Sequence, residues 1–426
     1  MKVMQLCYFK SAVLQQNCWF HSAILISLPV RNQLNQAMEQ LIELFRRLLR
    51  LTDTSYIRYL HDQIDWSSRM LGIVGPRGVG KTTMLLQHIK LYHHVEDTLF
   101  VNADDIYFAE HRLFDLASDF YKNGGKHLFI DEVHKYQDWS KELKMIYDYY
   151  PDFQVVFTGS SILDIYKGNA DLSRRALSYF LPGLSFREYL ILAKDIRLPA
   201  YSLQEILEHK VELPGTERPL VLFKEYLTKG YYPFFNDPGY DMRLRNVINL
   251  TVENDIPIYA KLNAASTKKI RQLLYVIAQS VPFKPNFSKI GQMIDLHRNQ
   301  VADFLFYLEK AGVVAQLRGT TEGIRQLGKV EKTYLDNTNL AYALSDSKPE
   351  IGNIRETFFL SQMKVNNDVF SSDKADFTID KYTFEVGGQN KQQKQIQGIS
   401  DAYVVKDDIE YGHRNIIPLW HFGFNY

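Results

Sequence analysis

The sequence predicts an α/β fold built on a parallel, doubly wound sheet, and two observations lead to this prediction. First, five compact apolar runs have the length of buried strands and are bounded by Gly, Asn, Asp or Pro. They cover residues 70–74, 98–101, 127–131, 154–157 and 177–181. Second, amphipathic helical patterns separate these runs, for example over residues 139–150. Strands that alternate with helices form a parallel sheet, which binds ligands at the carboxyl ends of its strands.

Length and composition limit the function classes. A chain of 426 residues with 46% hydrophobic residues has room for two or three domains. A formal net charge of +1 gives no global attraction to nucleic acid or to a membrane, so any such surface must be local. Cys7 and Cys18 are the only cysteines of the sequence, which excludes a disulfide framework and favours the reducing cytoplasm.

The first residues differ from the rest of the chain. Residues 22–30 are apolar but too short to span a bilayer, and they lack the cleavage site of a signal peptide. We therefore expect residues 1–31 to be an unstructured or mis-started leader, with Met38 as an alternative start; a membrane anchor is the alternative. Leu34, Met38, Leu41, Phe45 and Leu48 then share one helical face, which predicts an amphipathic helix over residues 32–51.

A glycine-rich turn follows the first apolar run. Gly75 to Thr82 fit the pattern G-x-x-x-x-G-K-[ST], whose backbone N–H groups cradle phosphate oxygens. Lys81 is expected to reach the β- and γ-phosphates, and the helix that starts there adds its positive end. The predicted phosphate-binding residues are Gly75, Pro76, Arg77, Gly78, Val79, Gly80, Lys81, Thr82 and Thr83. The alternative is a glycine-rich turn without function, but the predicted strand before residue 75 and the predicted helix after residue 81 argue against it.

Two acids end the third apolar run. Asp131 is expected to bind Mg²⁺ together with the Thr82 hydroxyl, and Glu132 to orient and polarise the attacking water. A strand that merely ends in acids is the alternative. Guanine-specific proteins usually carry an Asn/Thr-Lys-x-Asp signature, and none follows the predicted sheet, so ATP is the expected nucleotide.

Three further polar residues are candidates for catalysis. The fourth run ends in Thr158-Gly159-Ser160-Ser161, and a hydroxyl there, with Ser160 preferred, could sense the γ-phosphate. A simple turn is the alternative. Arg174 and Arg175 precede the fifth run, and an arginine supplied by a neighbouring copy can stabilise charge during phosphoryl transfer. A solvated surface pair explains these arginines almost as well.

Together with the run Leu184-Ser185-Phe186-Arg187-Glu188-Tyr189, these motifs resemble the predicted AAA+ ATPases of bacteria and archaea that carry a C-terminal domain of unknown function. The resemblance covers about residues 38–426. It implies a three-layer AAA+ core with strand order 5-1-4-3-2, then a winged-helix region and a nuclease-like C-terminal fold. Residues 253–256 resemble a family segment to which the sequence assigns no chemistry.

The predicted division of the chain follows from these patterns. Residues 1–31 are the leader, 32–192 the ATPase core with its N-terminal helix, 193–265 a helical connector or lid, 266–330 a winged helix-turn-helix, and 331–426 the PD-(D/E)XK-like domain. Three short helices followed by a β-hairpin predict the winged helix. If it binds DNA, residues 297–300 begin the helix that enters the major groove, and Lys284, Lys289, Lys310 and Arg318 are candidates for phosphate contact.

The C-terminal region resembles a nuclease in layout but departs from it at one position. Glu356 lies on a predicted helix, Asp376 begins a strand and Glu385 lies in the next strand, and in active members two acids of this layout hold a divalent metal. The lysine expected two residues after the last acid is replaced by Gly387, and Lys391 is the nearest lysine downstream. We therefore expect an inactive relic used for binding or structure.

Three functions are consistent with the sequence. The leading hypothesis is a Mg²⁺-dependent ATPase whose nucleotide state drives or switches the downstream regions, with a protein client and a homo-oligomer as candidate partners and no membrane. The first alternative is an ATP-regulated DNA-binding protein. The second is a metal-dependent nuclease.

Overall fold

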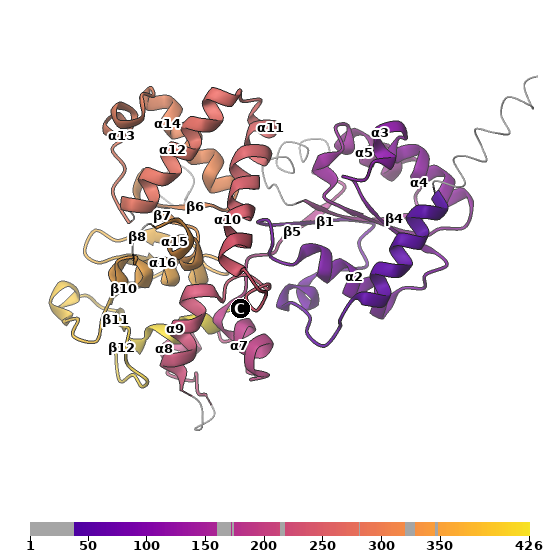
Figure 1. Ribbon diagram of the computed structural model, residues 1–426. Coiled ribbons are helices and arrows are strands. Elements are labelled where there is room, and N and C mark those ends of the chain that lie inside the picture. Colours follow the sequence, from indigo (N-terminus) through magenta and orange to yellow (C-terminus); the bar gives the residue numbers. More distant parts are fainter. Residues whose placement is uncertain are drawn as a thin grey trace, which may run out of the picture.

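The computed structural model describes residues 38–159, 172, 174–213, 218–280, 282–319, 329–345 and 348–426. The leader predicted over residues 1–31 and the candidate Ser160 lie outside the described residues. Among the described residues, no helix combines the length and the hydrophobicity needed to cross a bilayer. Two α/β halves lie side by side, and α10 (Tyr240–Leu250) and α11 (Ile256–Ala260) lie between them (Figure 1).

The first half is a five-stranded parallel sheet. Its strands are β1 (Met70–Val74), β2 (Thr98–Asn102), β3 (His127–Asp131), β4 (Gln154–Gly159) and β5 (Leu177–Phe180). Their order is β2-β3-β4-β1-β5, with every pair parallel, so the predicted order is confirmed. Every residue of β1 is buried, as expected for a central strand with helices on both faces. β5 is an edge strand and is mostly exposed.

Helices cover both faces of this sheet, as the alternating pattern predicts. They are α2 (Lys81–Tyr92), α3 (Tyr107–Glu110), α4 (Leu113–Lys122) and α5 (Trp139–Tyr149). Alternate side chains of β1 enter different cores: Leu71 and Ile73 pack with the α2 face, and Met70 and Val74 pack with α4 and α5. The helix over residues 38–51 packs at the β2 edge through Leu41, Phe45 and Leu49.

A helical connector follows the sheet. It contains α7 (Phe186–Lys194), α8 (Leu203–Leu207), α9 (Pro219–Lys229), α10, the π-helical turn η3 (Thr251–Asp255) and α11. Three helices and an antiparallel hairpin come next, in the predicted order. They are α12 (Ala264–Ser280), α13 (Phe287–Ile294), α14 (Arg298–Lys310), β6 (Val314–Arg318) and β7 (Val330–Leu335). This element order fits a winged helix, and that assignment stays a prediction.

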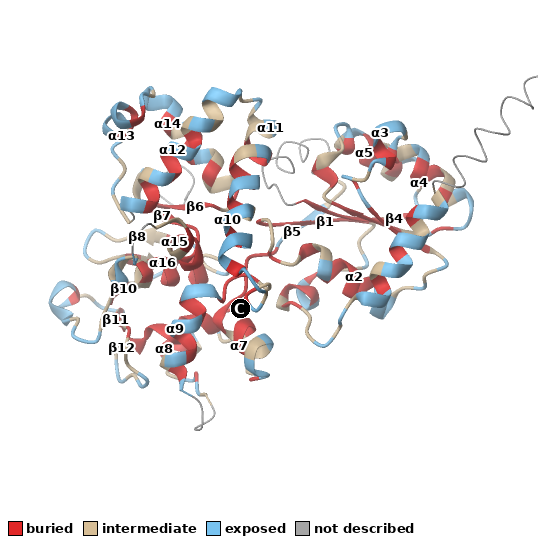
Figure 2. Cartoon of the chain, viewed as in Figure 1, coloured by how far each residue is buried: buried red, intermediate tan, exposed pale blue. Residues whose placement is uncertain are grey.

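A second five-stranded sheet closes the chain. It follows α15 (Thr338–Leu344) and α16 (Ile351–Met363), and its strands are β8 (Val369–Ser371), β9 (Phe377–Ile379), β10 (Tyr382–Gly387), β11 (Ala402–Lys406) and β12 (Ile416–Pro418). The order is β12-β11-β10-β9-β8, and β10 pairs in parallel with β11 but antiparallel with β9. One continuous hydrophobic core joins the α2 face, the connector, the three helices and this sheet. The buried residues of these elements are red in Figure 2.

A buried guanidinium fastens the connector to the first half. Arg58 donates to Glu188, at 2.9 Å from Nε and 3.0 Å from Nη2, and Glu188 lies in the first turn of α7. The same guanidinium donates to the carbonyl oxygens of Val79 at 2.6 Å and of Pro182 and Gly183 at 2.9 Å each. Arg58 is 5% exposed and Glu188 is fully buried. The glycine-rich turn and the start of α7 are therefore held by one cation.

Arg58→Ala is expected to lower the free energy of unfolding by about 3–5 kcal/mol, because it leaves a buried carboxylate and three carbonyls without their donor. Chemical denaturation followed by circular dichroism measures this loss. The matched control is Arg197→Ala, since Arg197 pairs with Asp195 at an exposed site, and its cost is expected to stay below about 1 kcal/mol. Equal losses in the two variants would contradict the role given to Arg58.

Candidate functional site

The glycine-rich turn has the backbone shape that phosphate binding requires. Gly78 and Gly80 have φ of 82° and 96°, a region that side chains with a Cβ rarely adopt. Gly75 has no room for a Cβ, because one built there lies 2.2 Å from the carbonyl oxygen of Leu181. Gly80 then caps α2, so the free N–H groups of the helix end lie next to the turn.

Lys81 lies inside this turn. Its ammonium donates to the carbonyl oxygens of Gly75 at 3.0 Å and Pro76 at 2.8 Å, and the residue is 4% exposed. Burial lowers the pKa of Lys81 to about 8, against the pull of nearby carboxylates in the other direction. The charged form is therefore only moderately favoured at neutral pH.

Hydroxyl groups from two elements hold the carboxylate that ends β3. Asp131 accepts from the Thr82 hydroxyl at 2.8 Å and from the Thr158 hydroxyl at 2.5 Å. Thr158 also accepts from the backbone N–H of Glu132 at 3.1 Å. Burial raises the pKa of Asp131. The predicted magnesium ligands Thr82 and Asp131 thus lie together, and Thr158 of β4 holds Asp131 from the neighbouring strand.

Glu132 leaves the strand in a left-handed conformation, with φ of 50°. This conformation is uncommon for a residue with a side chain and occurs often at active sites. Its carboxylate lies 3.4 Å from Nε2 of His134 and 3.9 Å from Nη2 of Arg77. Burial lowers the pKa of His134 to about 3, so this ring is neutral. Glu132 therefore lies between a neutral ring and a cation of the phosphate turn.

Asp255 is a residue of this site that sequence analysis missed, as it missed His134 and Lys135. It ends the π-helical turn η3 and accepts from Arg77 at 3.0–3.2 Å and from Lys135 at 3.3 Å. It belongs to residues 253–256, to which the sequence assigned no chemistry. Arg77 and Asp255 are 178 residues apart, so no local pattern could reveal the pair.

The other predicted catalytic residues lie elsewhere. Arg174 is exposed, and Arg175 pairs with Asp148 at 2.9 Å, near the end of α5. Both arginines precede β5, at the amino edge of a sheet whose phosphate turn lies at the carboxyl edge. They do not join Lys81 and Asp131 within this chain, and their role toward a neighbouring copy stays a prediction.

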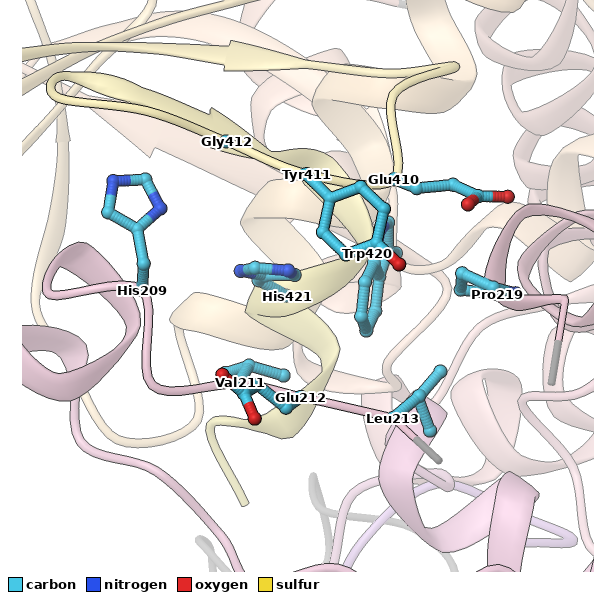
Figure 3. Close-up of a pocket in the computed structure, with 10 residues that line it drawn as sticks. All are labelled: His209, Val211, Glu212, Leu213, Pro219, Glu410, Tyr411, Gly412, Trp420 and His421. Atoms are coloured by element: carbon cyan, nitrogen blue, oxygen red, sulfur yellow. The ribbon is translucent and has the colours of Figure 1, made fainter. Parts of the chain in front are cut away.

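Two cavities differ in their relation to this site. One of about 420 Å³ is bordered by Thr82, Asp131 and Asn102, at the carboxyl edge of the parallel sheet. The other, of about 350 Å³, lies between the connector and the C-terminal segment and is shown in Figure 3. Trp420, His421 and Tyr411 line the second cavity, and none of the predicted site residues does. The first cavity is therefore the one that borders the predicted magnesium ligands.

The predicted C-terminal acids Glu356, Asp376 and Glu385 form ion pairs with lysines. Lys332 donates to Glu356 at 3.0 Å and to Asp376 at 3.1 Å. Lys391 pairs with Glu385, and a Cβ at position 387 would lie 2.6 Å from the Lys391 side chain. Glycine at 387 thus leaves room for the Lys391 side chain. Within the described ranges, no group of three His, Cys, Asp or Glu residues is arranged to hold a metal ion.

Some of the candidate DNA-contacting residues are exposed, and others are already ion-paired with acids of this chain. Residues 297–300 are exposed at the start of α14, as the prediction requires. Two of the four candidate phosphate contacts are ion-paired: Arg318 with Glu309 at 2.8 Å, and Lys284 with Glu331 at 2.6 Å. These pairs reduce the positive charge of this face.

Two family models match the chain. Residues 67–190 match the model described as AAA domain, and residues 220–350 match a domain of unknown function, DUF8612. The chain therefore contains an AAA-family P-loop ATPase domain followed by a domain of unknown function, which confirms the coarse part of the predicted resemblance. The winged-helix and nuclease-like assignments stay predictions.

Individual relatives are more distant. An uncharacterised protein of Methanocaldococcus jannaschii is 24% identical over 268 residues, which are 58% of this chain and 56% of that relative. The match thus spans little more than half of the length of this curated relative. Among solved structures, a Walker-type ATPase of Pyrococcus abyssi is 11% identical with a TM-score of 0.41, over 65% of this chain and 91% of that chain. AMPPCP-bound DnaA from Aquifex aeolicus is 13% identical with a TM-score of 0.27, over 63% and 86%.

ATP affinity is expected to fall as pH rises through about 8, because the Lys81 ammonium that attracts phosphate then loses its proton. Titration calorimetry at pH 7 and pH 9 measures the change. Lys81→Arg is the control, since a guanidinium stays charged at both pH values, and its affinity should depend less on pH. An equal pH dependence in the two proteins would mean that another group titrates.

Proposed function

We propose that this chain hydrolyses ATP with Mg²⁺ at the turn of residues 75–83. The observation that carries the proposal is the shared placement of Lys81, Thr82 and Asp131, with Thr82 and Asp131 joined at 2.8 Å. A buried lysine in a glycine-rich turn that leads into a helix N-terminus suits a polyphosphate. A hydroxyl and a carboxylate oxygen are ligands that Mg²⁺ prefers, and Mg²⁺ commonly takes few protein ligands because phosphates and water supply the others.

The residues of the site divide the work. Backbone N–H groups of the turn and Lys81 bind and orient the β- and γ-phosphates, while Thr82 and Asp131 hold the metal. Magnesium, when bound, neutralises phosphate charge and helps the leaving group to depart. Glu132 orients a water molecule and accepts its proton as the water oxygen bonds to the γ-phosphorus. The bond from the γ-phosphorus to the bridging oxygen then breaks, which gives ADP and phosphate.

The glycine-rich turn of residues 75–83, called the P-loop from here on, also contacts residues that follow the parallel sheet in the chain. These contacts support a coupling of nucleotide state to the downstream regions. A Cβ at Gly78 would lie 3.1 Å from the Phe234 ring, and a Cβ at Gly312 would lie 2.7 Å from Pro76. Gly312 joins α14 to β6, and Phe234 follows α9. We propose that ATP turnover repositions these contacts and thereby acts on a protein client. DNA is the less favoured partner because Arg318 and Lys284 are ion-paired.

Lys81→Ala is expected to abolish ATP binding, and Glu132→Gln to retain ATP while turnover falls at least about 100-fold. The reason is that Lys81 binds phosphate, whereas Glu132 acts on water after binding. Phosphate release and calorimetry measure the two effects, with and without added DNA. Arg197→Ala is the control at an exposed site of the connector. Full turnover in Glu132→Gln would remove Glu132 from the mechanism.

We propose a structural role for the C-terminal acids. Lys332 between Glu356 and Asp376 replaces the positive charge that a metal ion brings to such acids. The Tyr334 hydroxyl adds a hydrogen bond to Glu356 at 2.8 Å. Lysines thus offset the charge of these acids, which favours the inactive relic over the metal-dependent nuclease.

Incubation of the protein with supercoiled plasmid and Mg²⁺ or Mn²⁺ is expected to give no nicking, because lysines hold the carboxylates. Agarose gels show the conversion to nicked circles. Glu385→Ala is the matched control for a contaminating nuclease, which that substitution leaves untouched. Metal-dependent nicking that disappears in Glu385→Ala would establish the nuclease instead.

A further inference from the structure

Asp255 is the buried acid that reaches the P-loop site from the connector. The residue is 3% exposed, although it lies in a short helical turn between α10 and α11. One carboxylate there holds two cations, Arg77 of the P-loop and Lys135 of the segment after β3. A buried carboxylate is costly unless it is paired, and these two cations supply the pairing.

The π-helical turn places Asp255 for this contact. Pro257 has no N–H and cannot donate to the carbonyl of residue 253, which interrupts the regular helical ladder. The N–H of Ile256 instead donates to the carbonyl of Thr251, five residues back. Such an insertion rotates the residues that follow it and occurs often at functional sites. The sequence feature that the family resemblance left unexplained therefore produces the position of one side chain.

Arg77 lies between Asp255 and Glu132. It forms a forked pair with Asp255, through Nε at 3.2 Å and Nη2 at 3.0 Å, and its Nη2 lies 3.9 Å from Glu132. A guanidinium held on two donors keeps one orientation, unlike a flexible solvated side chain. Asp255 thus fixes a cation beside the carboxylate proposed to activate water.

We propose that Asp255 is a positioning residue for phosphoryl transfer: it holds Arg77 as an arginine supplied by the same chain for the charge that develops on the transferred phosphoryl group. The inference rests on the proposed ATPase function. It assigns to Arg77 the task that the sequence suggested for Arg174 and Arg175, which lie at the opposite edge of the sheet. Lys135, on the same carboxylate, limits how far Asp255 can move.

The test separates binding from turnover. Asp255→Asn is expected to lower kcat about 10- to 100-fold, while KM and the Kd for ATP change less than about threefold, because a misplaced cation affects the transition state more than ground-state binding. Arg77→Gln is expected to give a similar loss of kcat. The double variant should be no slower than Arg77→Gln alone, since both substitutions remove one interaction.

Glu253→Gln is the matched control. Glu253 lies in the same π-helical turn but pairs with Arg271 of α12, so its kcat should equal that of the original protein. An unchanged kcat in Asp255→Asn, or independent losses that multiply in the double variant, would overturn the inference. If Asp255→Asn does not fold, as judged by its thermal transition, Arg77→Gln alone decides, and a normal kcat there also overturns it.

The proposed function and this inference fail differently. Absence of Lys81-dependent hydrolysis in the unaltered protein removes the ATPase proposal and the inference together. Normal hydrolysis in the unaltered protein with full activity in Asp255→Asn and Arg77→Gln removes only the role of Asp255.

Discussion

The guanidinium of Arg58 is the constraint on which the relation between the two halves depends. A buried arginine must find partners for its N–H groups, and here they come from the P-loop, from the segment after β5 and from the first turn of α7. Glu188 accepts hydrogen bonds from Nε and Nη2 of Arg58, and it also closes the capping box of α7 with Ser185. Ser185 in turn donates to the backbone oxygen of Tyr426 at 2.8 Å. A displacement of the P-loop is therefore opposed at once by the connector and by the C-terminal segment.

Charge balance governs the nucleotide site itself. Among the described residues, the charged groups that act on Lys81 include Asp131, Glu132, Asp255 and Arg77, and Lys135 joins them through Asp255. Three cations thus face three carboxylates in a partly buried space, where electrostatic interactions are stronger than in water. Neither sign dominates, so Mg²⁺ and a polyphosphate can enter together without leaving a large unbalanced charge. This balance includes a residue from each half, which makes the site a property of the whole chain.

Sequence patterns predicted the strands and helices whose signals lie within their own residues. A strand and its neighbouring turn contain their own signals, so the bounds of β1 and β3 agree with the prediction at every residue. The short strands β8 and β12 were not predicted. Within the site, Lys81, Thr82 and Asp131 are brought together as expected. The ion pair of Asp255 with Arg77 was not predictable, because it depends on how two distant segments pack.

The C-terminal region shows the same limit of local patterns in a second way. Counting two residues from Glu385 leads to Gly387 and to the conclusion that the cation is missing. In space the cation is present, because a lysine four residues further along lies over the glycine and pairs with Glu385. A lysine from a later position can thus take the place of the expected one, because the glycine at the expected position has no Cβ to block its side chain. The role that we propose for Arg77 is an exchange of the same kind, because an arginine of the P-loop would then do what was expected of Arg174 and Arg175. In both regions the chemistry follows from where the charged atoms lie, and the spacing of residues along the chain is only one of the ways to place them.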